Sequence, residues 1–173
     1  VLLFMAAIVA AFWYLRTEEA EREQEALRRD VEYAQQRVRL RLLERQEQVM
    51  HMARDLVTQT VAQEEFAQRA EALVNQYPEL QAITWVDEYG RINASHRAAS
   101  LPTEWARYPA EVLQGDETAR AFDLVREQQQ PVYAQQTIQA NQPVPLLQLQ
   151  VPLNVQGRFN GVLLAEYSVD GLR

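Results

Sequence analysis

The stretch from residue 78 to residue 95, PELQAITWVDEYGRINAS, divides the chain into a helical part and a part rich in strands. Residues 81–86 are rich in β-branched and aromatic side chains, which are typical of strands. Residues 87–90, Asp-Glu-Tyr-Gly, supply turn residues, and Gly90 can adopt a positive φ. Residues 91–95 then resume an extended pattern. The sequence therefore predicts a β-hairpin here, with helices before it and mostly strands after it.

The first 15 residues, VLLFMAAIVAAFWYL, form an uncharged apolar run. About 20 such residues cross a bilayer, and Trp13 and Tyr14 lie where an aromatic belt is expected. Residues 1–16 are therefore predicted to be the C-terminal part of a transmembrane helix. The alternative is the end of a cleaved signal peptide, which fits poorly because small residues are missing from the cleavage position.

Residues 17–60 contain neither glycine nor proline and are dense in Ala, Leu, Glu, Gln and Arg, which is typical of a long helix. Apolar residues recur at spacings of three and four. They include Leu27, Val31, Ala34, Val38, Leu42, Val49 and Ala53. We expect the first half of this stripe to form a stalk or to pair with the same helix of a second subunit, giving a homodimer. The second half is expected to pack on the folded domain.

Residues 61–173 are predicted to form one domain. A shorter helix is expected over 64–77, and a further one over 116–129 with Asp116 as its N-cap and Ala119, Phe122 and Val125 or Leu124 buried. A short helix is expected to begin with Thr103 as its N-cap. Three strands are expected after the hairpin, over 132–138, 146–153 and 161–167. The predicted fold class is α+β: a five-stranded antiparallel sheet with the long helix on one face and the 98–130 segment over part of the other.

Composition and motifs exclude several classes of function. The net charge is −7, and an acidic balance argues against a nucleic-acid partner. The chain has no cysteine, which excludes disulfides, zinc–thiolate sites and cysteine nucleophiles. Only His51 and His96 are histidines, and no glycine-rich phosphate loop or cluster of carboxylates at ligand spacing occurs. We therefore predict no metal, no cofactor and no catalytic residue in this chain, which is not expected to be an enzyme by itself.

Four segments together resemble a known family: PELQAITWVDEYGRINAS, PVYAQQ, LLQLQVPL and GRFNGVLLAEYSVDGL. They look like the extracytoplasmic PAS-like sensor domain, also called PDC or single-Cache, of bacterial membrane histidine kinases, and among these the dicarboxylate-sensing kinases. The resemblance covers about residues 20–173. It implies a sensor domain in the periplasm, anchored in the inner membrane, with the kinase beyond residue 173. It also implies a ligand between the sheet and the loop-and-helix segment.

Polar and aromatic side chains near that space are the candidates for ligand binding. Arg97 ends the second strand and could pair in a bidentate manner with a carboxylate. The full set of candidates is Trp85, Ser95, His96, Arg97, Tyr133, Gln135, Gln148, Gln150 and Tyr167. The expected ligand is a small organic acid. For several of these residues a structural role remains open: Arg97, Gln148 and Gln150 as solvent-facing side chains, and Trp85 as part of the core.

The predicted function is that of a ligand-sensing domain of a two-component histidine kinase, which signals across the membrane through its N-terminal helix. Two alternatives remain. The same type of domain serves chemoreceptors and cyclic-dinucleotide enzymes, and a dimerising stalk without a ligand would have a sheet–loop gap filled by its own side chains.

Overall fold

The computed structural model describes residues 37, 39–58 and 61–170. The chain divides after Leu40, and the described residues from Arg41 onward form one compact unit. The predicted transmembrane segment, 1–16, and most of the predicted dimer stripe lie outside the described residues. Among the helices that the structure does describe, none is long and apolar enough to cross a membrane.

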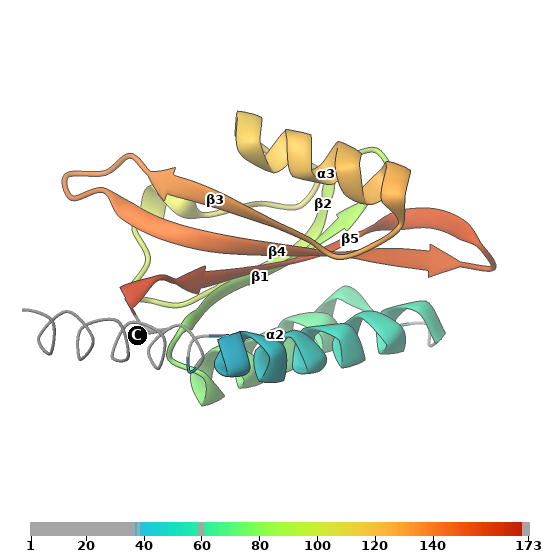
Figure 1. The fold of residues 1–173 in the computed structure, drawn as a ribbon, viewed down its shortest axis with the longest axis horizontal. Coiled ribbons are helices and arrows are strands. Elements are labelled where there is room, and N and C mark those ends of the chain that lie inside the picture. The colour runs from blue at the N-terminus through green and yellow to red at the C-terminus, as the bar shows by residue number, and fades with distance from the viewer. Residues whose placement is uncertain (1–36, 38, 59–60, 171–173) are drawn as a thin grey trace, which may run out of the picture. The chain divides into compact units, whose positions relative to one another are not determined.

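The centre of the fold is a five-stranded sheet, drawn in Figure 1, in which every neighbouring pair of strands is antiparallel. Its strands are β1 (Leu80–Asp87), β2 (Ile92–Arg97), β3 (Val132–Ile138), β4 (Val144–Val155) and β5 (Arg158–Ser168). The spatial order is β2-β1-β5-β4-β3, so the last strand of the chain lies at the centre. The predicted α+β class and the number of strands are confirmed.

Two helices cover one face of the sheet: the helix over residues 39–58 and α2 (Gln63–Gln76) (Figure 1). Val49 and Met52 of the first helix and Phe66 of the second are buried against the sheet. The Phe66 ring lies 5.7 Å from the ring of Trp85, between their centroids. The prediction that the second half of the long helix packs on the domain is confirmed.

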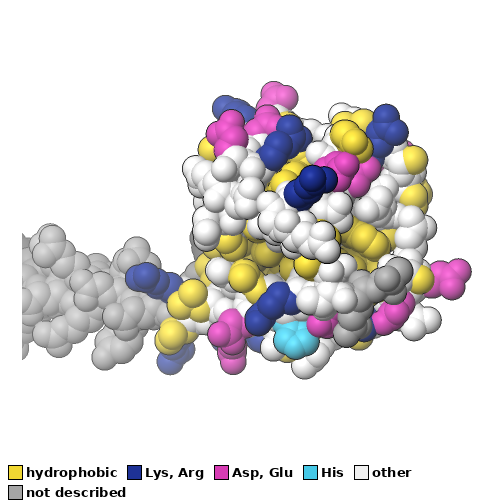
Figure 2. Space-filling model, turned by 90° about the vertical axis from the view of Figure 1, so that its right-hand side faces the viewer, with side chains coloured by type: hydrophobic (Ala, Val, Ile, Leu, Met, Phe, Trp, Pro, Cys, Tyr) yellow, Lys and Arg dark blue, Asp and Glu magenta, His cyan; other side chains and the backbone are white. Residues whose placement is uncertain are grey.

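The opposite face is covered by α3 (Asp116–Gln128) and by the loop before it, which contains the 3-10 turn η1 (Thr103–Trp105) (Figure 1). Apolar side chains of α3, Phe122 and Val125, pack on Val162 and Leu164 of β5. Viewed from the end of the molecule in Figure 2, apolar side chains lie mostly in a band between charged groups at the top and bottom.

The start and the buried face of α3 differ from the sequence prediction. Gly115, not Asp116, is the N-cap, and it makes no side-chain cap bond. Ala119 and Leu124 are exposed, whereas Thr118 and Ala121 are buried. Because residues 118, 121, 122 and 125 follow the helical spacing of three and four, they share the face that packs on the sheet. Likewise Pro102, not Thr103, is the N-cap of η1.

Candidate functional site

The nine predicted site residues divide between the two faces of the sheet. Ser95, Arg97, Gln148 and Gln150 lie on the α3 face, where Gln150 Nε2 donates to the Thr118 carbonyl at 3.0 Å. The other five lie on the face that carries α2 and the long helix: Trp85, His96, Tyr133, Gln135 and Tyr167. Since neighbouring strand residues point to opposite faces, one pocket cannot be lined by all nine.

The two faces use these residues differently. Gln148 and Gln150 are fully buried, so they do not face solvent. Tyr133 is 41% exposed, and its hydroxyl donates to Gln46 Oε1 of the long helix at 2.8 Å. Tyr167 is buried, and its hydroxyl has no hydrogen-bond partner among the described residues. Burial raises the pKa of the Tyr167 phenol, so this hydroxyl stays protonated.

On the α3 face, polar side chains from all five strands form two hydrogen-bonded groups that Arg107 of the loop joins, and we call these five side chains the polar row. Its members are Thr84 (β1), Ser95 (β2), Gln136 (β3), Gln148 (β4) and Glu166 (β5). Thr84 and Ser95 share a hydrogen bond of 2.8 Å between their hydroxyl oxygens. Gln148 Nε2 donates to Gln136 Oε1 at 2.7 Å and to Glu166 Oε2 at 3.1 Å. Polar groups thus cross the whole sheet beneath α3 and its loop.

The negative charge of Glu166 in the polar row is neutralised by Arg107, which lies on the loop before α3. Arg107 Nη1 donates to Glu166 Oε1, and Nη2 donates to Oε2 at 3.2 Å, which gives a bidentate ion pair. Glu166 is completely buried, and its carboxylate requires such a partner because an unpaired buried charge is very costly. Arg107 also donates to Thr84 Oγ1 at 3.3 Å and lies over the Trp105 ring. Arg107 therefore links the loop to β1 and β5 at the centre of the sheet.

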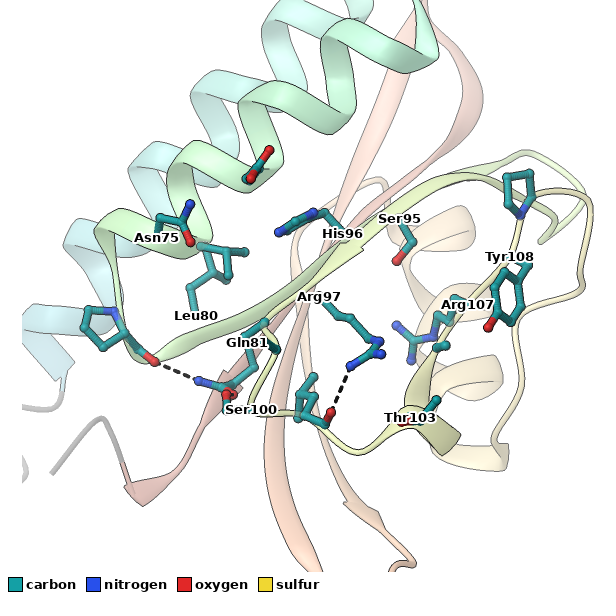
Figure 3. A pocket seen from close by; sticks show the side chains of 18 residues that line it. Asn75, Leu80, Gln81, Ser95, His96, Arg97, Ser100, Thr103, Arg107 and Tyr108 are labelled. Atoms are coloured by element: carbon teal, nitrogen blue, oxygen red, sulfur yellow. Dashed lines mark hydrogen bonds between the residues drawn. The ribbon is translucent and has the colours of Figure 1, made fainter.

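A cavity of about 950 Å³ opens beside β2, between α2 and the loop that follows the strand. Figure 3 shows Ser95, Arg97 and Arg107 on the loop side of β2, while His96 points toward α2. Arg97 Nη1 donates to the Leu101 carbonyl at 2.9 Å. No carboxylate of the described residues pairs with Arg97, so most of its five N–H donors are unused. The cavity thus presents an arginine that lacks a counter-ion within the described part of the chain.

A second contact joins the start of the sheet to the long helix. Arg45 Nε lies 2.5 Å from Glu79 Oε1, and the Arg45 guanidinium lies 3.9 Å from the centre of the Tyr77 ring. The Glu79 carbonyl accepts from the Ser168 N–H at 2.8 Å. Burial, the largest single influence, raises the pKa of Glu79, but the hydrogen bond from Arg45, a main-chain hydrogen bond and the nearby positive charges together outweigh it, so the pKa lies below its usual value. This ion pair links the long helix to β1 and β5 beside the cavity walls formed by Leu80 and Gln81.

Five residues of the hydrogen-bond network on the α3 face were not among the predicted site residues. They are Thr84, Arg107, Thr118, Gln136 and Glu166. A signal existed for Glu166, the one charged residue in the apolar run GVLLAEY, because a buried acid needs a basic partner. Nothing in the sequence identified that partner as Arg107. Across the part of the chain that the structure describes, no group of three or more His, Cys, Asp or Glu could hold a metal ion.

Comparison with known proteins identifies the fold. No family model and no curated protein matches this sequence. The ligand-binding domain of the amino acid chemoreceptor PctC of Pseudomonas aeruginosa PAO1, in complex with GABA, has a TM-score of 0.54 at 14% identity, over 76% of this chain and 54% of that one. The extracellular domain of the putative histidine kinase vpHK1S-Z8 has a TM-score of 0.58 at 12% identity, over 86% and 59%.

An extracellular ligand-binding receptor from Desulfohalobium retbaense has a TM-score of 0.56 at 19% identity, over 80% of this chain and 25% of that one. The chain thus spans between a quarter and about three fifths of these structures. It shares its fold with the ligand-binding domain of that chemoreceptor and with the extracellular domain of that putative histidine kinase.

Proposed function

We propose that this chain is the extracytoplasmic sensor domain of a membrane receptor and that it binds a small organic acid. The observation that carries the proposal is the cavity beside β2, in which Arg97 has no counter-ion among the described residues. A guanidinium group binds a carboxylate through two parallel hydrogen bonds. The cavity volume of about 950 Å³ is within the range of small-molecule sites.

Arg97 is the central residue of the proposed site. His96 and Tyr108 lie at the same cavity and supply further polar groups. Arg107 is less available, because Glu166 already accepts from both of its terminal nitrogens. We propose that ligand binding pulls the loop after β2 toward Arg97, while the Arg107–Glu166 pair keeps the far part of that loop on the sheet.

The signal is proposed to reach the long helix through Glu79 and Arg45. Leu80 and Gln81 line the cavity, and the adjacent Glu79 pairs with Arg45 of the helix. A change in the position of β1 would therefore bias the position of this helix, as a shift between two populations. We propose that the helix acts within a homodimer, since Leu40 and Leu43 are 66% and 51% exposed on it.

The host protein is proposed to be a sensor histidine kinase of a bacterial inner membrane, with this domain in the periplasm. The resemblance of the sequence to such kinases and the shared fold with the extracellular domain of one putative histidine kinase support this proposal. A chemoreceptor is the second candidate, because the same fold occurs in the PctC ligand-binding domain.

A thermal-shift screen tests the proposed ligand class. The full chain in mild detergent is heated with C2–C6 mono- and dicarboxylates, amino acids and neutral sugars, and unfolding is followed by tryptophan fluorescence. At about 100 times its dissociation constant, an acid should raise Tm by about 5 °C or more, while sugars leave Tm unchanged. The Arg97→Ala variant should lose the shift.

If no compound in the screen shifts the Tm of the folded protein, the alternative of a dimerising stalk without a ligand is favoured. One observation points that way: the gap between the centre of the sheet and the loop is filled by the chain's own Arg107, Thr118 and Gln148. The cavity beside β2 is not filled in this way, which is why a sensor is preferred.

A further inference from the structure

One half of the outer edge of β2 has open main-chain hydrogen-bonding groups. The strand order places β2 at the edge of the sheet. The Ala98 N–H donates to the Gln81 carbonyl at 2.6 Å, so the main chain of residue 98 faces β1, and with it that of His96, which pairs with Ile83. The N–H and C=O groups of Ser95 and Arg97 therefore face outward. None of the described residues bonds to them.

The other half of this edge is covered by the chain itself. The Ile92 N–H donates to the Glu111 carbonyl at 2.8 Å, and the Ala110 N–H donates to the Ile92 carbonyl at 2.8 Å. Arg91 and Val112 form an isolated antiparallel bridge. The loop thus begins to pair as an outer strand at one end of β2 and then diverges, and the cavity beside β2 lies where this pairing stops.

The cavity is bounded by a helix on one side and a loop on the other. Val74 and Asn75 of α2 and Tyr108 and Pro109 of the loop line it. Figure 3 shows Asn75 and Tyr108 on opposite sides of β2. A groove between an edge strand and a helix suits an extended peptide, which adds as a further strand at a spacing of about 4.8 Å.

We infer that this groove binds a short acidic peptide, which adds to β2 as an outer strand and places a carboxylate on Arg97. The inference rests on the proposed function, because it uses the same cavity and the same arginine. It goes further by assigning the ligand a peptide main chain. A simple dicarboxylate supplies only acceptors, whereas the outward groups of β2 include carbonyls that need N–H donors.

Charge supports an acidic peptide over a basic one. Arg97 has no carboxylate partner among the described residues, and His96 lines the same groove. Within the described part of the chain, Glu71 is the only acidic residue that lines it. A glutamate side chain that points to the loop side would meet Arg97, and its neighbours along the peptide would point to α2.

The first test uses three peptides that differ only in their main chain. Fluorescein-labelled Ala-Glu-Ala-Glu-Ala, with a blocked C-terminus, and two forms N-methylated at alternate residues are titrated with the full chain in mild detergent. Fluorescence anisotropy gives each Kd. One N-methylated form should bind about tenfold more weakly or worse than the parent, because it loses the N–H donors that face β2. Equal affinity of all three peptides would overturn the inference.

The second test changes the strand. Ser95→Pro removes the outward N–H of β2 without removing a bond to β1, and edge strands tolerate proline at such positions. Ser95→Pro removes the N–H that would donate to a carbonyl of the peptide, whereas Ser95→Ala keeps it, so the parent peptide should bind about tenfold more weakly to Ser95→Pro than to Ser95→Ala. Equal affinity of the two variants, with Ser95→Pro shown to be folded by circular dichroism, would overturn the inference. If that variant does not fold, the peptide comparison alone decides.

The two proposals fail in different ways. If no carboxylate shifts Tm and Arg97→Ala changes nothing, the proposed function is wrong. If acids bind through Arg97 but N-methylation has no effect on the peptide, only the peptide inference is wrong.

Discussion

The carboxylate of Glu166 is a fully buried charge, so it needs hydrogen-bonding and charged partners inside the fold. Its side chain is 0% exposed, and it lies on the central strand, between Ala82 on β1 and Gln148 on β4. Arg107 and Gln148 donate to its two oxygens. A buried ion pair contributes little net stability compared with an apolar replacement, but removing one partner leaves the other charge uncompensated.

Glu166→Gln should therefore be strongly destabilising. We expect the free energy of unfolding to fall by about 3–5 kcal/mol, because the guanidinium group of Arg107 would lose its charged partner while still mostly buried. Glu127→Gln, on the exposed side of α3, is the matched control and should change stability by less than about 0.5 kcal/mol. Urea unfolding measures both. Similar losses in the two variants would show that the ion pair is not what holds the loop.

Glu79 should contribute to stability in a pH-dependent way. The pKa of Glu79 is lowered in the folded state, so the Arg45–Glu79 contact stabilises the fold above the unfolded pKa of about 4.3 and is lost as pH falls through the folded pKa. At pH 7, Glu79→Gln should lower the free energy of unfolding by about 1–3 kcal/mol.

Below about pH 4 the difference between Glu79→Gln and the wild type should shrink, because the wild-type carboxyl is then protonated as well. Urea unfolding from pH 3 to pH 8 measures this trend, with Glu47→Gln on the exposed side of the same helix as the control. A difference that is constant with pH would contradict the role of the Glu79 charge.

At the scale of the elements, the pairing of β1 with β5 builds the centre of the sheet. Asp87 pairs with Gly161, which has φ = +125°. A Cβ atom at Gly161 would lie 2.0 Å from the Val86 carbonyl oxygen. The two strands can approach this closely only because position 161 has no side chain.

Gly161→Ala should consequently disrupt the sheet, whereas Gly157→Ala in the β4–β5 turn should not. Gly157 also has a positive φ, +77°, but a Cβ atom there would have no atom of the described residues within 4 Å. We expect a loss of roughly 3 kcal/mol or more for Gly161→Ala and about 1 kcal/mol for Gly157→Ala. Thermal unfolding compares them. Equal losses would mean that the backbone angle, not the close approach of β1, limits position 161.

The helices and strands were largely predictable, because each follows from local periodicity. The alternation of Leu147, Leu149 and Val151 with glutamines correctly predicted β4, although the strand runs farther, over Val144–Val155. Alternation along β2 likewise places Ser95 and His96 on opposite faces of the sheet, which argues against a catalytic pair. Alternation within one strand does not show which residues of different strands share a face. Trp85 and Tyr133 lie on the face opposite Gln148 because of the strand order, which long-range pairing sets.

The residues of the candidate site were predictable only in part. Ser95, His96 and Arg97 were expected at one place because they are adjacent at a strand end, and all three line the cavity beside β2. The polar row depends on contacts between residues far apart in sequence, such as Arg107 and Glu166, which are 59 positions apart. No local pattern specifies such a pair.

At the scale of the whole molecule, the two faces of the sheet hold different elements in place. The α3 face holds the loop in place through the polar row and Arg107. The opposite face holds the long helix through apolar packing and the Arg45–Glu79 pair. The cavity beside β2 lies at the edge of the sheet and is lined by α2 on one side and by the loop on the other. A ligand in it, as proposed above, would contact both.

Arg97 is the residue on which the proposed ligand site depends most, since we propose that it binds the carboxylate of the ligand in this cavity. The most direct test is calorimetric titration of the acid that gives the largest thermal shift into the wild type, Arg97→Gln and Arg91→Gln. Arg91 precedes the same strand but is exposed and does not line the cavity, so it controls for the loss of one positive charge. We predict that Arg97→Gln weakens binding by about 10- to 100-fold and that Arg91→Gln changes it by less than about twofold. Equal affinities in all three proteins would contradict the account.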